Sequence, residues 1–150
     1  FGELKNYKKV TEKIISERTK KFINTTGDLK KILAPLVKLK DENKFLAQVF
    51  QSIRIEVNDE LEVIRTLLSD SSKYIKKGGR LVCISYHSLE DRIVKKFIQN
   101  GGYNDKVVSD FYGNKNVIFK KVGKMITPSS EEIKLNNRSR SAKLRIAEKI

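Results

Sequence analysis

The chain has no tryptophan, and its 150 residues include only one cysteine, one histidine and two prolines. A single cysteine cannot form a disulfide within the chain, and so little cysteine and histidine argues against a metal site. We therefore expect no disulfide framework, no metal, and a reducing compartment such as the cytoplasm. Apolar runs stay well short of the roughly 18 residues that cross a membrane, and no secretory pattern is present. We expect no membrane partner.

The sequence also lacks a glycine-rich nucleotide loop. Neither G-x-G-x-x-G nor G-x-x-x-x-G-K-[ST] occurs anywhere in it. Sheets that bind a nucleotide-type cofactor normally carry such a turn after an early strand. Either the sheet is incomplete in these residues, or the chain binds no such cofactor.

Positive charge is what the sequence has in excess. There are 32 Lys and Arg residues against 18 Asp and Glu, which gives a formal net charge of +14. This excess favours a polyanion partner, nucleic acid first, because each Lys or Arg set against a phosphate releases condensed counterions. A lysine-rich solvated surface without such a partner is the alternative. The apolar share of 39% is enough for the core of one domain.

The first part of the chain has helical periodicity. Apolar spacing predicts a helix within residues 4–23, and Thr25 to Asp28 provides an N-cap for a second helix, which Pro35 kinks or ends early. A polar linker is predicted at 38–44, before a third helical segment. We therefore predict a helical subdomain over residues 1–44, which could extend to about residue 50, and a second domain over residues 45–150.

The second part alternates helix and strand. Leu81 to Ile84 is a short apolar run after Gly78-Gly79, typical of a parallel strand that is covered on both faces. Ser88 is a candidate cap for the helix that follows. Val117 to Val122 predicts another strand, and alternation over 142–146 predicts a last, one-sided strand. The fold class is therefore α/β, the closing half of a sheet with an antiparallel edge.

Polar residues follow the predicted apolar strand at the step Ser85-Tyr86-His87-Ser88. In open α/β sheets ligands bind beyond the carboxyl ends of strands. His87 is the sole histidine, so any step that needs an imidazole must use it. The alternative is a histidine that satisfies backbone groups at a tight turn. Ser85, His87 and Ser88 are the candidate catalytic residues.

Other polar residues each have two interpretations. The carboxylate of Asp91 is either functional or simply stabilised at a helix N-terminus, and Arg92 either grips a phosphate or pairs with an acid. Arg54 and Asn58 lie four residues apart, on one helical face if the helix is unbroken. Asn58 is then a functional amide or a cap at a helix start.

The segment 136–145 is basic and contains no acidic residue. Arg, Ser and Asn side chains are those that contact phosphate and sugar. Strand alternation places Lys143 and Arg145 on the face opposite Leu144 and Ile146, where they can line a surface. The candidate RNA-binding residues of this segment are Arg138, Arg140, Ser141, Lys143 and Arg145.

Three segments in this order resemble one family: QVFQSIRIEVNDEL at 48–61, GGRLVCISYHSLEDR at 78–92 and RSRSAKLRIAE at 138–148. It is the ribosomal RNA small subunit methyltransferase H, or MraW, family, which the chain resembles over essentially its whole length. The resemblance implies a class I S-adenosylmethionine-dependent methyltransferase sheet, which is Rossmann-like, with an inserted helical subdomain. The implied reaction is methylation of the exocyclic N4 of a cytidine in 16S rRNA.

The resemblance further implies that the chain is only the C-terminal portion. The family's cofactor loop and donor-holding acidic residues lie in an N-terminal half, so we expect no cofactor-binding residue here and S-adenosyl-L-methionine bound by that half. The step at 85–88 would be a substrate wall, with Tyr86 stacked on a flipped base. The expected partner is 16S rRNA in the small ribosomal subunit, the expected location is cytoplasmic, and a homodimer is possible.

Two other hypotheses remain at this stage. A stand-alone basic RNA-binding module would need no reaction of its own. A DNA-binding helical domain over residues 2–40 is weaker, because its lysine-rich helices offer no recognisable set of base-reading residues.

Overall fold

The computed structural model describes residues 3–103 and 117–150. The chain divides into two compact units, Phe1–Asp59 and Glu60–Ile150, and each has its own buried core. In the described part of the chain, none of the helices has both the length and the apolar character needed to cross a bilayer.

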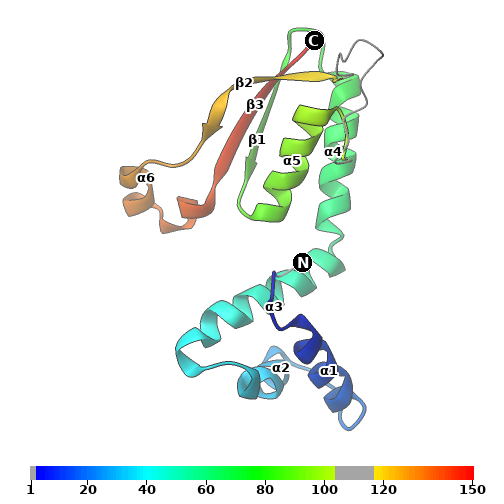
Figure 1. Cartoon of the computed structure of the whole chain (residues 1–150), viewed down its shortest axis with the longest axis vertical. Coiled ribbons are helices and arrows are strands. Elements are labelled where there is room, and N and C mark those ends of the chain that lie inside the picture. The colour runs from blue at the N-terminus through cyan, green and yellow to red at the C-terminus, as the bar shows by residue number, and fades with distance from the viewer. Residues whose placement is uncertain (1–2, 104–116) are drawn as a thin grey trace. The chain divides into compact units, whose positions relative to one another are not determined.

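Unit 1–59 is helical. It contains α1 (Tyr7–Arg18), α2 (Thr26–Leu33), 3₁₀ turns at Ala34–Leu36 and Leu39–Asp41, and α3 (Glu42–Val57) (Figure 1). The predicted N-cap is confirmed: Thr25 Oγ1 accepts from the Asp28 N–H at 3.0 Å, and Asp28 Oδ2 accepts from the Thr25 N–H at 3.0 Å. Pro35 ends α2 early, as predicted, because its ring and missing N–H do not allow the helix to continue.

The predicted boundary at residue 44 differs from the division in the structure, which falls after Asp59. The polar stretch 38–44 is not a linker, since it forms a 3₁₀ turn and the first residues of α3. Helix α3 belongs to the first unit because its apolar face completes that core. The buried members of this core are Val10, Leu29, Leu33, Phe45, Leu46 and Val49.

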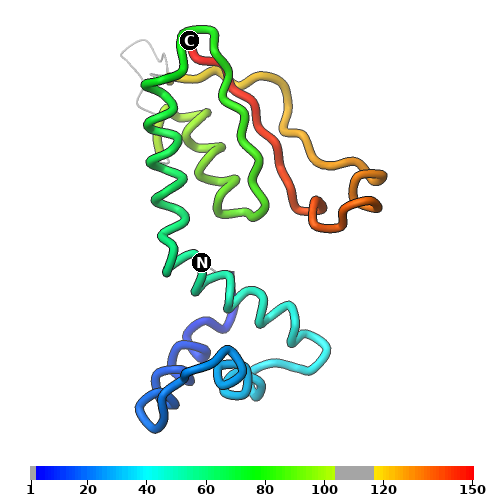
Figure 2. The backbone as a smooth tube through the Cα atoms, turned by 180° about the vertical axis from the view of Figure 1, so that it is seen from behind, coloured from blue at the N-terminus to red at the C-terminus, as the bar shows by residue number. Residues whose placement is uncertain are grey.

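Unit 60–150 is a three-stranded sheet with helices. It contains α4 (Glu60–Tyr74), β1 (Arg80–Ser85), α5 (Ser88–Asn100), β2 (Phe119–Ile126), α6 (Ser130–Leu135), a 3₁₀ turn (Asn137–Ser141) and β3 (Lys143–Lys149). The strand order is β1-β3-β2, and β3 is antiparallel to both neighbours. Both views show β3 between the other two strands (Figures 1 and 2). The predicted strand at 117–122 is therefore confirmed with later bounds.

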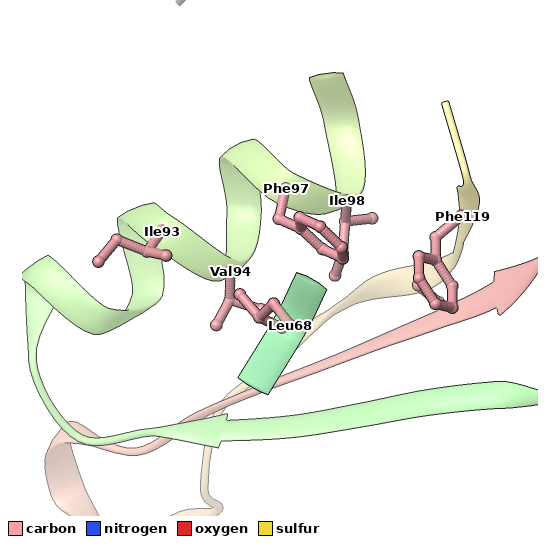
Figure 3. Close-up of a cluster of buried hydrophobic side chains, with 7 residues drawn as sticks. Leu68, Ile93, Val94, Phe97, Ile98 and Phe119 are labelled. Atoms are coloured by element: carbon pink, nitrogen blue, oxygen red, sulfur yellow. The ribbon is translucent and has the colours of Figure 1, made fainter. Parts of the chain in front are cut away.

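The core of this unit lies between α5, α4 and one face of the sheet. Figure 3 shows Val94 and Phe97 of α5 facing Leu68 of α4, with Phe119 at the start of β2. The rings of Phe97 and Phe119 lie 5.8 Å apart, and Phe119 is 1% exposed. Strand β2 is thus attached to α5 by an aromatic contact.

The prediction that β1 is a parallel strand covered on both faces is wrong for these residues. In the described chain β1 pairs only with β3, and that pairing is antiparallel. Its side chains alternate: Leu81 and Cys83 lie against the core, whereas Val82 and Ile84 are more than half exposed. Val82 and Ile84 pair with Ile146 and Leu144, so the face turned away from α5 is apolar.

Candidate functional site

The turn from β1 into α5 is built around a histidine cap. We call residues Ser85–Glu90 the β1–α5 corner. His87 is the N-cap of α5, and its Nδ1 accepts from the Glu90 N–H at 3.4 Å. Glu90 Oε2 accepts from the Tyr86 N–H at 2.9 Å and from the His87 N–H at 3.3 Å. This is a capping box with histidine in the place of Ser or Thr.

The cap corrects one prediction and bears on another. Ser88 is not the cap of α5 but its first residue, and its side chain is exposed. The alternative prediction for His87 is that it satisfies backbone groups at a tight turn. The hydrogen bond from the Glu90 N–H to His87 Nδ1 has this geometry. The spacing His87-x-x-Glu90 is that of a capping box, so this role of Glu90 could have been read from the sequence.

Two polar atoms at the corner lack hydrogen-bond partners. Ser85 is 2% exposed, and both its Oγ and His87 Nε2 are shielded from solvent without a hydrogen bond to any described residue. Because Nδ1 accepts a hydrogen bond, the proton of a neutral imidazole lies on Nε2. Nε2 lies 3.1 Å from Glu90 Oε1, but the geometry is not that of a hydrogen bond. Unsatisfied buried groups cost stability, so they call for an explanation.

Two side chains of the corner and one from the start of α4 have the composition of a metal site. Glu60, His87 and Glu90 bring one potential ligand atom each within 4.8 Å of one another. A metal needs the lone pair of Nε2, whereas the cap places the proton there. Glu90 is also committed to two backbone N–H groups. The arrangement is that of a hydrogen-bonded cap rather than of a set of metal ligands.

Asp91 is the centre of an ion cluster in the first turn of α5. It is 7% exposed and accepts from Arg145 Nε at 2.6 Å and Arg145 Nη2 at 3.1 Å, with Lys143 Nζ at 3.4 Å. Burial alone would raise the pKa of Asp91, but the hydrogen bonds and charges of Arg145 and Lys143 outweigh it and hold that pKa below its usual value.

This cluster corrects the prediction for the last strand. Lys143 and Arg145 do alternate with Leu144 and Ile146, but the basic residues lie on the α5 side. The side chain of Arg145 is only 14% exposed, and that of Lys143 is 36% exposed. Asp91 and Arg145 bind each other, so neither presents its charged group to RNA in this arrangement.

The remaining candidates are spread over both units. Arg138, Arg140 and Ser141 are exposed in the 3₁₀ turn before β3, and Arg92 is exposed on α5. Arg54 and Asn58 belong to unit 1–59, where the Asn58 N–H donates to the Arg54 carbonyl at 3.0 Å. Asn58 therefore closes α3 rather than starting a helix. The structure brings together Ser85, His87, Asp91, Lys143 and Arg145 at the start of α5.

The fold and the corner define an α/β chain with a polar strand-to-helix turn. A family model described as the MraW methylase family matches residues 1–150. The chain belongs to this family. A class I methyltransferase fold follows from that membership.

Named relatives agree with this assignment. The chain is 52% identical over 150 residues to the ribosomal RNA small subunit methyltransferase H of Flavobacterium johnsoniae, covering 100% of the chain and 50% of the relative. It is 50% identical over 149 residues to the protein of that name in Cytophaga hutchinsonii, covering 99% of the chain and 50% of the relative. For Bacteroides fragilis the identity is 48% over 150 residues, with 99% and 49% covered. The chain spans about half the length of these relatives.

Proposed function

We propose that this chain is the C-terminal part of an S-adenosylmethionine-dependent methyltransferase that acts on N4 of a cytidine in 16S rRNA. The observation that carries the proposal is the identity of about half of all positions, over the whole chain, to proteins named ribosomal RNA small subunit methyltransferase H. The net charge of +14 suits an RNA substrate. Family membership favours this enzyme over a stand-alone RNA-binding module.

The β1–α5 corner lacks the features of a cradle for the methyl donor. The β1–α5 corner contains no glycine, and its N–H groups at Tyr86, His87 and Glu90 are already bonded within the corner. When bound to the complete enzyme, S-adenosylmethionine would supply the methyl group. This chain would hold the substrate, and residues 1–59 would be the inserted helical subdomain.

The corner has the groups that a cytosine edge requires. Cytosine presents an N4 amine, which donates, beside a ring nitrogen and a carbonyl oxygen, which accept. Ser85 Oγ can accept from the amine, and the Nε2–H of His87 can donate to an acceptor, since neither atom has a hydrogen-bond partner among the described residues. Tyr86 is 58% exposed and can stack on a base that has left its helix.

The apolar sheet face supports the view that more protein covers this unit. Val82 and Ile84 are 55% and 57% exposed, and Ile126 is 53% exposed. Exposed apolar side chains gathered on one face are typical of an interaction surface. The relatives have about as much sequence again with which to cover it.

Replacing His87 with asparagine is expected to separate the two roles of this residue. Asparagine is a preferred N-cap, so His87→Asn should keep the stability of the unit within about 0.5 kcal/mol, whereas His87→Ala should lose about 1 kcal/mol. Both variants lack Nε2, and both should lower methyl transfer by the complete enzyme to small ribosomal subunits, by about 100-fold. Thermal unfolding and incorporation of labelled methyl groups measure the two effects. Full turnover in His87→Asn would mean that His87 acts only as the N-cap of α5.

Replacing Ser85 with alanine is expected to change stability and activity in opposite directions. The hydroxyl is buried without a partner, so its removal should leave the free energy of unfolding unchanged or raise it by up to about 1 kcal/mol. Methyl transfer should fall by about tenfold, because an acceptor for the amine is lost. Ser69→Ala, on an exposed side chain of α4 in the same unit, is the matched control. A stability loss in Ser85→Ala with unchanged turnover would contradict the proposed role.

A further inference from the structure

A hollow with basic walls lies between the second half of α5 and strands β2 and β3, away from the β1–α5 corner. We call it the basic hollow. It is lined by Lys95 of α5, by Lys121 and Lys124 of β2, and by Arg145 of β3, with Ile98 and Met125 among its apolar lining. No acidic residue is among the described residues that line it.

The four cations differ in how they are held. Arg145 is fixed by Asp91, and its Nη2 also lies 3.5 Å from Met125 Sδ. Lys95, Lys121 and Lys124 are exposed, and none of them forms an ion pair or side-chain hydrogen bond with any residue that the structure describes. Their charges are therefore available to an anion, while Arg145 forms a rigid wall.

A β-bulge brings the two β2 lysines to the same hollow. Lys121 and Lys124 are three residues apart, so an unbroken strand would point them to opposite faces. The pairing with β3 shifts register between Val122 and Ile126, and Gly123 has φ of +65° within the shift. Four steps along β2, from Val122 to Ile126, match two along β3, from Ile146 to Leu144, so β2 carries two extra residues, and extra residues re-aim the side chains of a strand. The irregular backbone thus accounts for the presence of both Lys121 and Lys124 in the lining of the hollow.

The size of the hollow limits what it can bind. It encloses about 10 Å³, which is room for one water-sized group. A nucleobase does not fit, but a phosphate oxygen does. Lys95, Lys121 and Lys124 line this position without an ion pair to any residue that the structure describes, and their long side chains can approach the neighbouring oxygens.

We propose that the basic hollow seats a backbone phosphate of the RNA substrate, a contact that positions the strand without reading its sequence. The assignment to RNA, rather than to another anion, rests on the proposed function. Apart from Arg145, the cations of the hollow lie outside the basic segment 136–145, and they supply a phosphate contact that Arg145 alone, bound to Asp91, does not.

The test compares two triple variants of equal charge. Lys95→Gln, Lys121→Gln and Lys124→Gln together remove the available lysines of the hollow. Lys76→Gln, Lys77→Gln and Lys134→Gln remove three exposed lysines elsewhere in the same unit. Binding of a fluorescein-labelled single-stranded RNA is followed by anisotropy from about 50 to 200 mM salt. Circular dichroism confirms that both variants are folded.

We expect the hollow variant to bind RNA about tenfold more weakly at low salt, with a salt slope reduced by about 0.7, the contribution of one phosphate contact to a single strand. The control variant should change affinity by less than about threefold. Equal weakening by both variants would mean a general charge effect and would overturn the assignment.

Two further arms separate the other outcomes. Calorimetry with inorganic phosphate tests a free-anion site: phosphate binding lost in the hollow variant, with RNA binding unchanged, would overturn the RNA assignment. Methyl transfer by the complete enzyme tests the proposed function separately. If the hollow variant transfers methyl groups normally to small ribosomal subunits and its RNA binding keeps the wild-type salt slope, the phosphate site is refuted. The proposed methyltransferase function would then still stand.

Discussion

Replacing Asp91 with alanine is expected to lower the free energy of unfolding of unit 60–150 by about 3 kcal/mol. The carboxylate is 7% exposed and binds Arg145 through two hydrogen bonds. Its removal leaves the Arg145 guanidinium nearly buried and without its carboxylate, which costs more than the loss of an exposed pair. Urea unfolding at neutral pH measures the change.

Two variants control this result. Asp70→Ala breaks an exposed pair with Lys73 in the same unit and should cost about 0.5 kcal/mol or less. Asp91→Ala combined with Arg145→Met removes both charges and should recover much of the loss, since no charge is left buried. If Asp91→Ala is no more destabilising than Asp70→Ala, the ion cluster is not a structural element.

The same cluster makes stability depend on acid pH. The pKa of Asp91 in the folded state is below its value in the unfolded state, which is about 3.9 for Asp. The contribution of Asp91 is therefore fully present above the unfolded pKa and is lost as the pH falls through the folded pKa. Wild type should lose its advantage over Asp91→Asn below about pH 4. A stability difference between the two that does not change with pH would contradict this linkage.

Replacing Phe119 with alanine is expected to cost about 3 to 4 kcal/mol. Its side chain is almost completely buried against Phe97, and the cavity left behind is only partly closed by relaxation (Figure 3). Leu135→Ala, on a side chain that is 91% exposed in the same unit, is the control and should cost less than about 0.5 kcal/mol. A loss below about 1 kcal/mol for Phe119→Ala would place the ring outside the core.

Local chemistry could be read correctly from the sequence. The Thr25 cap and the stop at Pro35 depend on residues within one helical turn, so no distant contact can alter them. Each of these features is decided by the backbone preferences of a few neighbouring residues.

Features that depend on distant contacts could not be read in this way. Alternation in β3 gives two faces, but only Asp91 on α5 decides that the basic face turns inward. The polar stretch 38–44 resembles a linker until Phe45 and Val49 are seen packed with Leu29 and Leu33. At the β1–α5 corner the sequence pattern favours Ser88 as the N-cap of α5, whereas His87 occupies that position in the structure.

The position of β3 has a consequence for the order of folding. Arg80 pairs with Glu148 and Phe119 with Lys149, whereas β1 and β2 are not neighbours in the sheet. β1 and β2 are synthesised before β3 and do not pair with each other. The three-stranded sheet therefore forms only after β3 has been synthesised. Contacts so distant in sequence slow folding and leave strand edges open in the meantime. Nearly all of unit 60–150 must therefore be synthesised before its three-stranded sheet can form.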